Sequence, residues 1–430
     1  MPVSAAFTIF KAAKNRGASD IHLKVGTHPF FRIEGQLVRF GEHPVVTEEM
    51  MKRIVDEVTA ERHKKILAER LSVDLAYEHP ETGRLRINIF HQMGQLALVA
   101  RLIPDKVRSF KELNLPKVIE RLAEEERGLI LVTGTTGSGK STTLAAMIDK
   151  INRERSVRII TIEDPIEYVF KDELSLVSQR ELGFDTPSFS QGLRDALRED
   201  PEVIMVGEMR DLETIETALM AAETGHLVMS TLHTLDAKET VNRIISMFPG
   251  YRQNQIRVQL ASVLKAVISQ RLIPTIDRKR RVPAVEVLVN TPRIRELILS
   301  PERFDELYEA MSEGFIPYGM QTFEQSLFYL WKKGVIDEET ALDYATKRED
   351  LKLRMRGVAS DRDEKIWKPF EEMALREREA ERKAEIEAKP EETFFTGELK
   401  PEAFEKPAAE EEPAEKKFDL DELLKDIGIP

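Results

Sequence analysis

The sequence contains no cysteine among its 430 residues. Such a chain can form neither a disulfide nor a cysteine-ligated zinc site, which fits a reducing compartment. It lacks any uninterrupted apolar run close to the ~18 residues that a membrane-spanning helix requires, and residues 1–6 show no basic or long apolar region typical of a secretory signal. A net charge of −12 argues against a dedicated nucleic-acid binder, because phosphate backbones require a basic face. We therefore expect no nucleic-acid partner and no direct membrane insertion.

A glycine-rich stretch at residues 134–142 is the strongest positive signal. It has the spacing G-x-x-x-x-G-K-[ST] between an apolar run, 129–133, and a helix-like run, 143–148. Glycines let backbone N–H groups wrap around phosphates, a lysine reaches the β- and γ-phosphates, and a serine hydroxyl ligates Mg²⁺. A chance glycine-rich turn is the alternative, and the flanking strand and helix disfavour it. We expect a nucleoside triphosphate to be bound by Gly134, Thr135, Thr136, Gly137, Ser138, Gly139, Lys140, Ser141 and Thr142.

Acidic residues follow two further apolar strands. Glu163 and Glu167 come after the strand at 157–162, and Glu208 comes after the strand at 203–206. The carboxyl ends of parallel strands meet at one sheet edge, so these carboxylates should lie beside the phosphates. Each could instead be a loop residue or a helix cap, but two such segments beside one P-loop favour a site. Glu208 stands where many P-loop enzymes carry an aspartate.

Two histidines, His226 and His233, bracket the apolar strand 227–232. A lone histidine is usually structural, and an extended run of this length separates the pair too far for one metal ion. We interpret them as candidate sensors of the γ-phosphate, because both lie at the ends of a core strand.

These segments together resemble the secretion and type IV pilus ATPases, most closely the PilT/PilU branch of pilus retraction motors. The resemblance spans about residues 5–355. Residues 161–168 resemble the family's Asp box, residues 206–214 its Walker B segment and residues 222–234 its His box. Further similar stretches are 17–22, 32–35, 179–181, 196–201 and 319–327.

The resemblance implies a homohexameric ring of two-domain subunits that bind ATP and Mg²⁺ between the domains. It implies a cytoplasmic protein, peripheral at the inner face of the cytoplasmic membrane. Its partners would be an inner-membrane pilus platform protein and, as a further candidate, a paralogous retraction ATPase.

The same resemblance suggests residue roles. Glu167 would polarise the attacking water, Glu163 and Glu208 would support Mg²⁺ and water, and Ser141 with Glu208 would hold the metal. His226 and His233 would couple the state of the γ-phosphate to domain motion. Arginine candidates for the transition state are Arg86, Arg101, Arg243 and Arg271.

The expected fold class is α/β, because strands and helices alternate after the P-loop and so predict a parallel sheet covered on both faces. We expect a PAS-like α+β domain at 1–104, a linker at 105–127 and a RecA-like P-loop ATPase core at 128–290. A C-terminal helical part at 291–356 and a charged, largely disordered acidic tail at 357–430 would follow. Within this tail, residues 371–388 suggest a solvated helix. The acidic-amphipathic end, 418–427, is either a frayed terminus or a docking peptide.

Three functions remain in competition. The first is a motor for pilus retraction in twitching motility. The second is a pilus-assembly or type II secretion ATPase, although such relatives usually carry a four-cysteine zinc module and a longer N-terminal region. The third is an accessory or regulatory ATP-binding subunit, against which Lys140, Glu167 and Glu208 argue. Residues 291–298 only partly match the PilT retraction motif and residues 350–355 look more like PilU, which leaves main and accessory motors open.

Overall fold

The computed structural model describes residues 4–33, 35–103, 106–358 and 361–387. The chain divides into two compact units, Met1–Glu381 and Arg382–Pro430. Most of the second unit lies outside the described residues, and so does the predicted acidic-amphipathic run at 418–427. Among the helices of the described part, none is both long and apolar enough to cross a bilayer.

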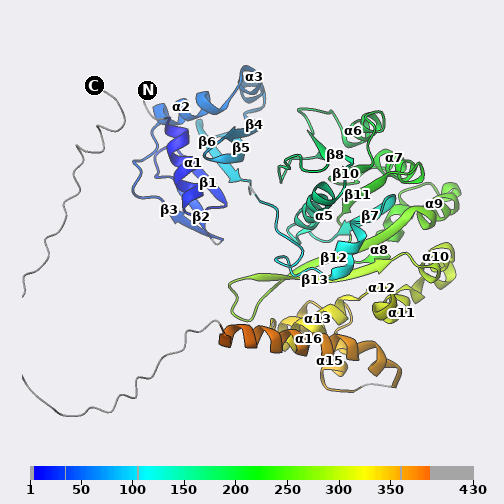
Figure 1. Ribbon diagram of the computed structural model, residues 1–430. Coiled ribbons are helices and arrows are strands. Elements are labelled where there is room, and N and C mark those ends of the chain that lie inside the picture. The colour runs from blue at the N-terminus through cyan, green and yellow to red at the C-terminus, as the bar shows by residue number, and fades with distance from the viewer. Residues whose placement is uncertain (1–3, 34, 104–105, 359–360, 388–430) are drawn as a thin grey trace, which may run out of the picture. The chain divides into compact units, whose positions relative to one another are not determined.

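A six-stranded antiparallel sheet forms the N-terminal part, in the strand order β3-β2-β1-β6-β5-β4 (Figure 1). Its elements are α1 (Ala5–Asn15), β1 (Asp20–Lys24), β2 (Phe30–Ile33), β3 (Gln36–Arg39), α2 (Glu48–Val58), α3 (Glu61–Arg70), β4 (Ser72–His79), β5 (Gly83–Gln92) and β6 (Gln95–Leu102). Thr47 caps α2, since its hydroxyl accepts a hydrogen bond from Met50 N. Helix α1 buries Ile9, Phe10 and Ala13, which recur at helical spacing on one face. The α+β character expected here is confirmed.

A seven-stranded sheet carries the glycine-rich loop, in the order β13-β12-β7-β11-β10-β8-β9. All neighbours are parallel except β12 and β13. The strands are β7 (Gly128–Thr133), β8 (Arg158–Glu163), β9 (Leu176–Glu181), β10 (Val203–Val206), β11 (Leu227–Leu232), β12 (Leu264–Pro274) and β13 (Arg281–Val289). Four of them match predicted strands, whereas β9, β12 and β13 were not foreseen.

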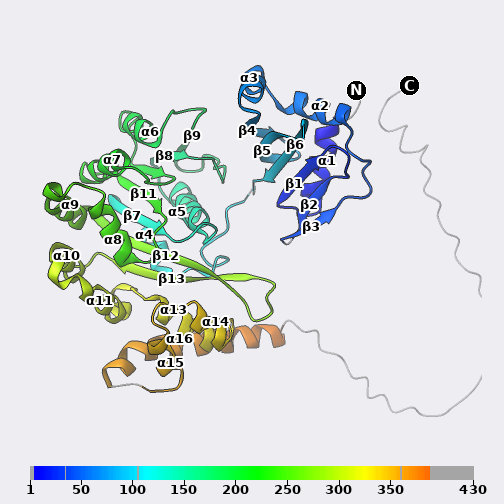
Figure 2. The same ribbon diagram turned by 180° about the vertical axis from the view of Figure 1, so that it is seen from behind.

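Helices cover both faces of this sheet (Figure 1 and Figure 2). They are α4 (Lys117–Leu122), α5 (Lys140–Glu154), α6 (Phe189–Ala196), α7 (Leu212–Glu223), α8 (Ala237–Ser246) and α9 (Gly250–Val263). Successive residues of β7 serve opposite faces: Leu129 and Leu131 pack with α6, α7, α8 and α9, whereas Ile130 and Val132 pack with α4 and α5. Burial on both sides explains why the sequence of β7 is a nearly continuous apolar run.

The regular elements of the described chain after β13 are helices, apart from an isolated bridge between Gln321 and Val287 of β13. They are α10 (Pro292–Leu299), the 3-10 helix η1 (Pro301–Glu306), α11 (Leu307–Glu313), α12 (Phe315–Tyr318), α13 (Phe323–Lys333), α14 (Glu338–Asp343), α15 (Arg348–Met355) and α16 (Asp361–Glu387). The capping box at the start of α13, Thr322 with Gln325, fixes where this helix begins. The helical character predicted for 291–356 is therefore present.

Helix α16 corrects our expectation of a solvated helix in a largely disordered segment. Phe370 is fully buried, and its ring centroid lies 4.0 Å from that of Phe315. Trp367 packs edge-on against Phe328 of α13 at 5.2 Å, and both views place α16 alongside α13. Lys332 of α13 also pairs with Glu371 at 2.7 Å. A few apolar residues in a highly charged segment were enough for packing, because they share one face of the helix.

Candidate active site

The glycine-rich loop joins the carboxyl end of β7 to the first turn of α5. Gly134 has φ of 138°, and a Cβ at this position would lie 2.4 Å from the carbonyl oxygen of Gln270. Only glycine therefore fits there. Gly139, with φ of 95°, forms the N-cap of α5. The loop directs the N-terminal end of α5, with its unpaired N–H groups and partial positive charge, into the site.

Two polar groups of the loop indicate that it fits phosphate. The Ser138 hydroxyl oxygen is buried and has no hydrogen-bond partner among the described residues. Lys140 is only 8% exposed, and its Nζ donates to the carbonyl oxygens of Gly134 at 2.9 Å and Thr135 at 3.0 Å. Burial lowers the pKa of the Lys140 ammonium, while the carboxylates of Glu208 and Glu167 act in the opposite direction. An anionic phosphate would satisfy both the buried hydroxyl and the lysine.

Glu208 and His233 lie side by side at the carboxyl edge of the sheet. They follow β10 and β11, which are adjacent and parallel, with Val206 opposite Ser230. His233 Nε2 lies 3.4 Å from Glu208 Oε2, and Arg210 Nε lies 2.6 Å from the same oxygen. Sequence reasoning did not select Arg210, although it stands two residues after Glu208 in the Walker B segment.

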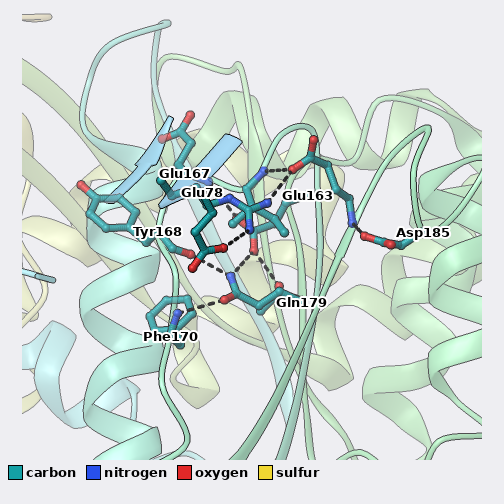
Figure 3. A network of polar contacts seen from close by, with 11 residues as sticks. Glu78, Glu163, Glu167, Tyr168, Phe170, Gln179 and Asp185 are labelled. Atoms are coloured by element: carbon teal, nitrogen blue, oxygen red, sulfur yellow. Dashed lines mark hydrogen bonds and ion pairs between the residues drawn. The ribbon is translucent and has the colours of Figure 1, made fainter. Parts of the chain in front are cut away.

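Glu163 ends β8 and is buried beneath the loop that carries Glu167 (Figure 3). Its Oε1 accepts hydrogen bonds from the Thr161 hydroxyl at 2.6 Å and from Gln179 Nε2 at 3.1 Å. Burial raises the pKa of the Glu163 carboxyl, and these hydrogen bonds only partly oppose it. The backbone N–H of Glu167 lies 3.5 Å from Glu163 Oε2. The two predicted acids of this segment are therefore neighbours, one buried and one exposed.

The two histidines lie at opposite ends of β11. His226 precedes the strand, its Nδ1 lies 2.9 Å from the Ala221 carbonyl oxygen, and its own carbonyl accepts from Gly128 N. The six residues of β11 lie between it and His233, so the two histidines are seven residue steps apart, which at ~3.3 Å per residue corresponds to about 23 Å. Only His233 reaches the edge where the glycine-rich loop begins. Within this chain, His226 is not assembled with the other candidates.

The four predicted arginines are not joined to the glycine-rich loop by any described contact. Arg86 on β5 and Arg101 on β6 pair with acids of their own sheet, namely Asp74 at 3.9 Å and Asp20 at 2.8 Å. Arg243, near the end of α8, lines a hollow of about 340 Å³ between α8 and α9.

The side chain of Arg271, on β12, contacts residues outside the glycine-rich loop. Its guanidinium stacks on Phe323 at 3.8 Å and donates to the Tyr344 carbonyl and the Thr346 hydroxyl. Burial lowers its pKa. These contacts hold the Arg271 side chain against α13 and the segment after α14.

Most of this chain is similar in sequence to known proteins. Residues 4–314 match the family model described as "Type II/IV secretion system protein". The type IV pilus retraction ATPase PilT of Pseudomonas aeruginosa is 44% identical over 330 residues, which are 77% of this chain and 95% of that protein. The type IV pilus ATPase PilU of the same organism is 39% identical over 349 residues, 81% of this chain and 91% of that protein. A crystal structure of the pilus retraction motor PilT with bound ADP superposes with a TM-score of 0.74 at 48% identity. It covers 80% of this chain and 98% of the compared chain.

Proposed function

This chain belongs to the type II/IV secretion system protein family, and we propose that it is a PilT-type ATPase that drives type IV pilus retraction and so twitching motility. The observation that carries this proposal is the similarity to PilT over 95% of that protein's length. The glycine-rich loop and the acids at one edge of the sheet supply the chemistry that a motor ATPase needs. A nucleotide also accompanies the similar PilT structure.

Within this proposal, each residue of the carboxyl edge has a part. Lys140 and the loop N–H groups bind the β- and γ-phosphates. Ser141 and Glu208 would hold Mg²⁺, which would supply positive charge beside the phosphates. Glu167, exposed on its loop, orients the attacking water and takes its proton. His233 beside Glu208 responds to the state of the γ-phosphate.

The remaining candidates fit a ring better than an isolated subunit. Arg86, Arg101 and Arg243 make no described contact with their own glycine-rich loop, so we propose that such arginines act across subunit boundaries in a homohexamer. Arg271 and His226 would then transmit domain movement without touching nucleotide. The partners would be an inner-membrane platform protein and a PilU-like paralogue, at the inner face of the cytoplasmic membrane.

An accessory role in retraction is the second candidate. Similarity to PilU extends over 349 residues, compared with 330 for PilT. The absence of cysteine still disfavours an assembly or secretion motor with a four-cysteine zinc module.

Deletion of the gene, with pili counted per cell, tests this function. Excess pili that fail to retract are expected for a main retraction motor, and restoration must require an intact Lys140. Bald cells would indicate an assembly motor instead. Normal retraction in the deletion strain, impaired only when a paralogous ATPase is inactivated by a lysine substitution in its P-loop, would support the accessory role.

A further inference from the structure

The side chain of Gln179 connects three parts of the active site (Figure 3). It lies on β9, the edge strand beside β8, where it stands opposite Thr161. Its Nε2 donates to Glu163 Oε1 at 3.1 Å and to the Tyr168 carbonyl at 2.8 Å, and its Oε1 accepts from Phe170 N at 2.9 Å. One amide thus joins the buried acid at the end of β8 to the backbone on the far side of Glu167.

The loop held by Gln179 has no regular structure of its own. Residues 164–170 form neither helix nor strand, so their position depends on side chains that bind their backbone. Within the described residues, no hydrogen bond fixes the carboxylate of Glu167 itself. Its placement therefore follows from the backbone on either side. Before it, Ile166 N donates to Glu181 Oε2 at 3.3 Å and the N–H of Glu167 lies near Glu163. After it, the backbone of Tyr168 and Phe170 is bound by Gln179.

We propose that Gln179 is a positioning residue for ATP hydrolysis, which sets the loop that presents Glu167 to the attacking water. This inference rests on the proposed ATPase function and deepens it. Gln179 itself does not touch the nucleotide. Its removal should slow turnover because a shift of about 1 Å in a catalytic group lowers rates by up to about 100-fold, while the glycine-rich loop continues to bind ATP.

Gln179 also influences the protonation of Glu163. Its N–H donates to the Glu163 carboxylate and stabilises the ionised form, as does Thr161, so it lowers a pKa that burial raises. The other titratable groups around this carboxyl are Glu167 on the loop, Glu181 opposite it on β9 and Glu208 after β10. Loss of the amide donor should therefore raise the pKa of Glu163 and make turnover more sensitive to acid.

The test compares Gln179→Leu, which keeps the approximate volume and loses all three hydrogen bonds, with wild type. The matched control is Gln259→Leu on α9, which loses one amide hydrogen bond to Glu223 away from the site. ATPase kcat and KM, binding of a fluorescent ATP analogue and the pH profile of kcat are measured on the full chain. We expect kcat to fall about 10- to 100-fold in Gln179→Leu, with KM within about threefold, analogue binding retained and the acid limb moved to higher pH. Gln259→Leu should match wild type.

The proposal is overturned by an unchanged kcat, by an unmoved acid limb, by lost analogue binding, or by an equal loss in Gln259→Leu. Gln179→Glu adds a second readout, because a carboxylate there faces Glu163: the acid limb should move further than in Gln179→Leu. An unmoved limb in this variant would also contradict the proposal. A wild-type protein that hydrolyses no ATP, by contrast, would refute the proposed function itself and not the part assigned to Gln179.

Discussion

The phenol oxygen of Tyr168 lies 3.0 Å from the hydroxyl of Thr142, although the two residues are 26 positions apart in the chain. Thr142 belongs to the first turn of α5 and directly follows Ser141. Tyr168 belongs to the loop that carries Glu167. This hydrogen bond therefore connects the proposed phosphate-binding helix to the loop proposed to orient water. A displacement of the helix can in this way shift the loop.

Replacement of Tyr168 by Phe tests this connection. The ring remains and only the hydroxyl is lost, so a neutral hydrogen bond of about 1 kcal/mol disappears. We expect ATP turnover to fall several-fold, with little change in the melting temperature. Tyr251→Phe is the matched control, because Tyr251 is 87% exposed on α9. Equal turnover in both variants would show that the bond between loop and helix is not used.

Replacement of Glu167 by Gln tests the assignment of the general base. The amide keeps the size of the side chain but cannot accept a proton, so hydrolysis should fall by about 10²- to 10⁴-fold. ATP binding, measured with a fluorescent analogue, should persist because Lys140 and the loop N–H groups are intact. Glu173→Gln, at an exposed position of the segment that leads to β9, serves as the control. Wild-type hydrolysis in Glu167→Gln would move the role of base to another acid.

Phe370→Ala tests the packing of α16. Phe370 is fully buried against Phe315, and truncation of a buried phenylalanine costs about 3–5 kcal/mol of unfolding free energy. Leu375→Ala on the same helix is the control, since Leu375 is 44% exposed. Chemical denaturation should separate the two variants clearly. Comparable midpoints would mean that α16 is not packed in solution.

The same packing leads to a prediction for truncated chains. Because a chain ending after Gly357 lacks α16, we expect it to expose Phe328 and to melt at a lower temperature than wild type. A chain ending after residue 387 keeps α16 and should melt like wild type. Thermal unfolding of the two truncated chains distinguishes these outcomes.

Glu286 should make stability depend on pH. It is fully buried on β13, its Oε1 accepts from Ala237 N at 2.8 Å, and burial raises its pKa to about 8. Asp236 and Glu324 raise this pKa further, while the Ala237 N–H and Arg271 oppose them. The folded state then keeps a proton that the unfolded state releases near its ordinary pKa of 4.5.

The sign of the effect follows from this difference. The contribution of Glu286 to stability is fully present below pH 4.5 and is lost progressively as the pH rises to about 8. The loss amounts to at most about 1.4 kcal/mol per pH unit. Unfolding free energies measured from pH 5 to 8 should fall less steeply in Glu286→Gln than in wild type and in the exposed control Glu126→Gln. Parallel curves would contradict a buried neutral Glu286.

Local patterns in the sequence were sufficient for much of the proposed site. The loop from Gly134 to Thr142 was recognisable because its glycine, lysine and hydroxyl positions are fixed by spacing along the chain. The acids after β8 and β10 were recognisable because each follows an apolar strand, and parallel pairing brings such strand ends to one edge. The roles assigned to these residues remain predictions.

Contacts between residues far apart in the chain could not be predicted from local sequence patterns. Gln179 lies on β9, where four of the six residues are half-buried, and the short polar sequence of this strand carries no strong strand signal. Gln179 reaches the loop only because β9 pairs with β8, which places it opposite Thr161 and within hydrogen-bonding distance of Tyr168. Strands β12 and β13 were not predicted, although both are rich in buried apolar residues.

The sequence by itself determined that this chain has a loop with the spacing of a P-loop and a parallel sheet, because the order of neighbouring residues along the chain is enough to predict both. The tertiary structure alone decided that Gln179 and Tyr168 hold the loop of Glu167, that His226 stays at the opposite edge from His233, and that α16 packs on α13. Each of these depends on which distant segments meet. Such contacts form because burial and hydrogen bonding are satisfied across the whole fold. A single stretch of sequence does not show which distant segment it will meet.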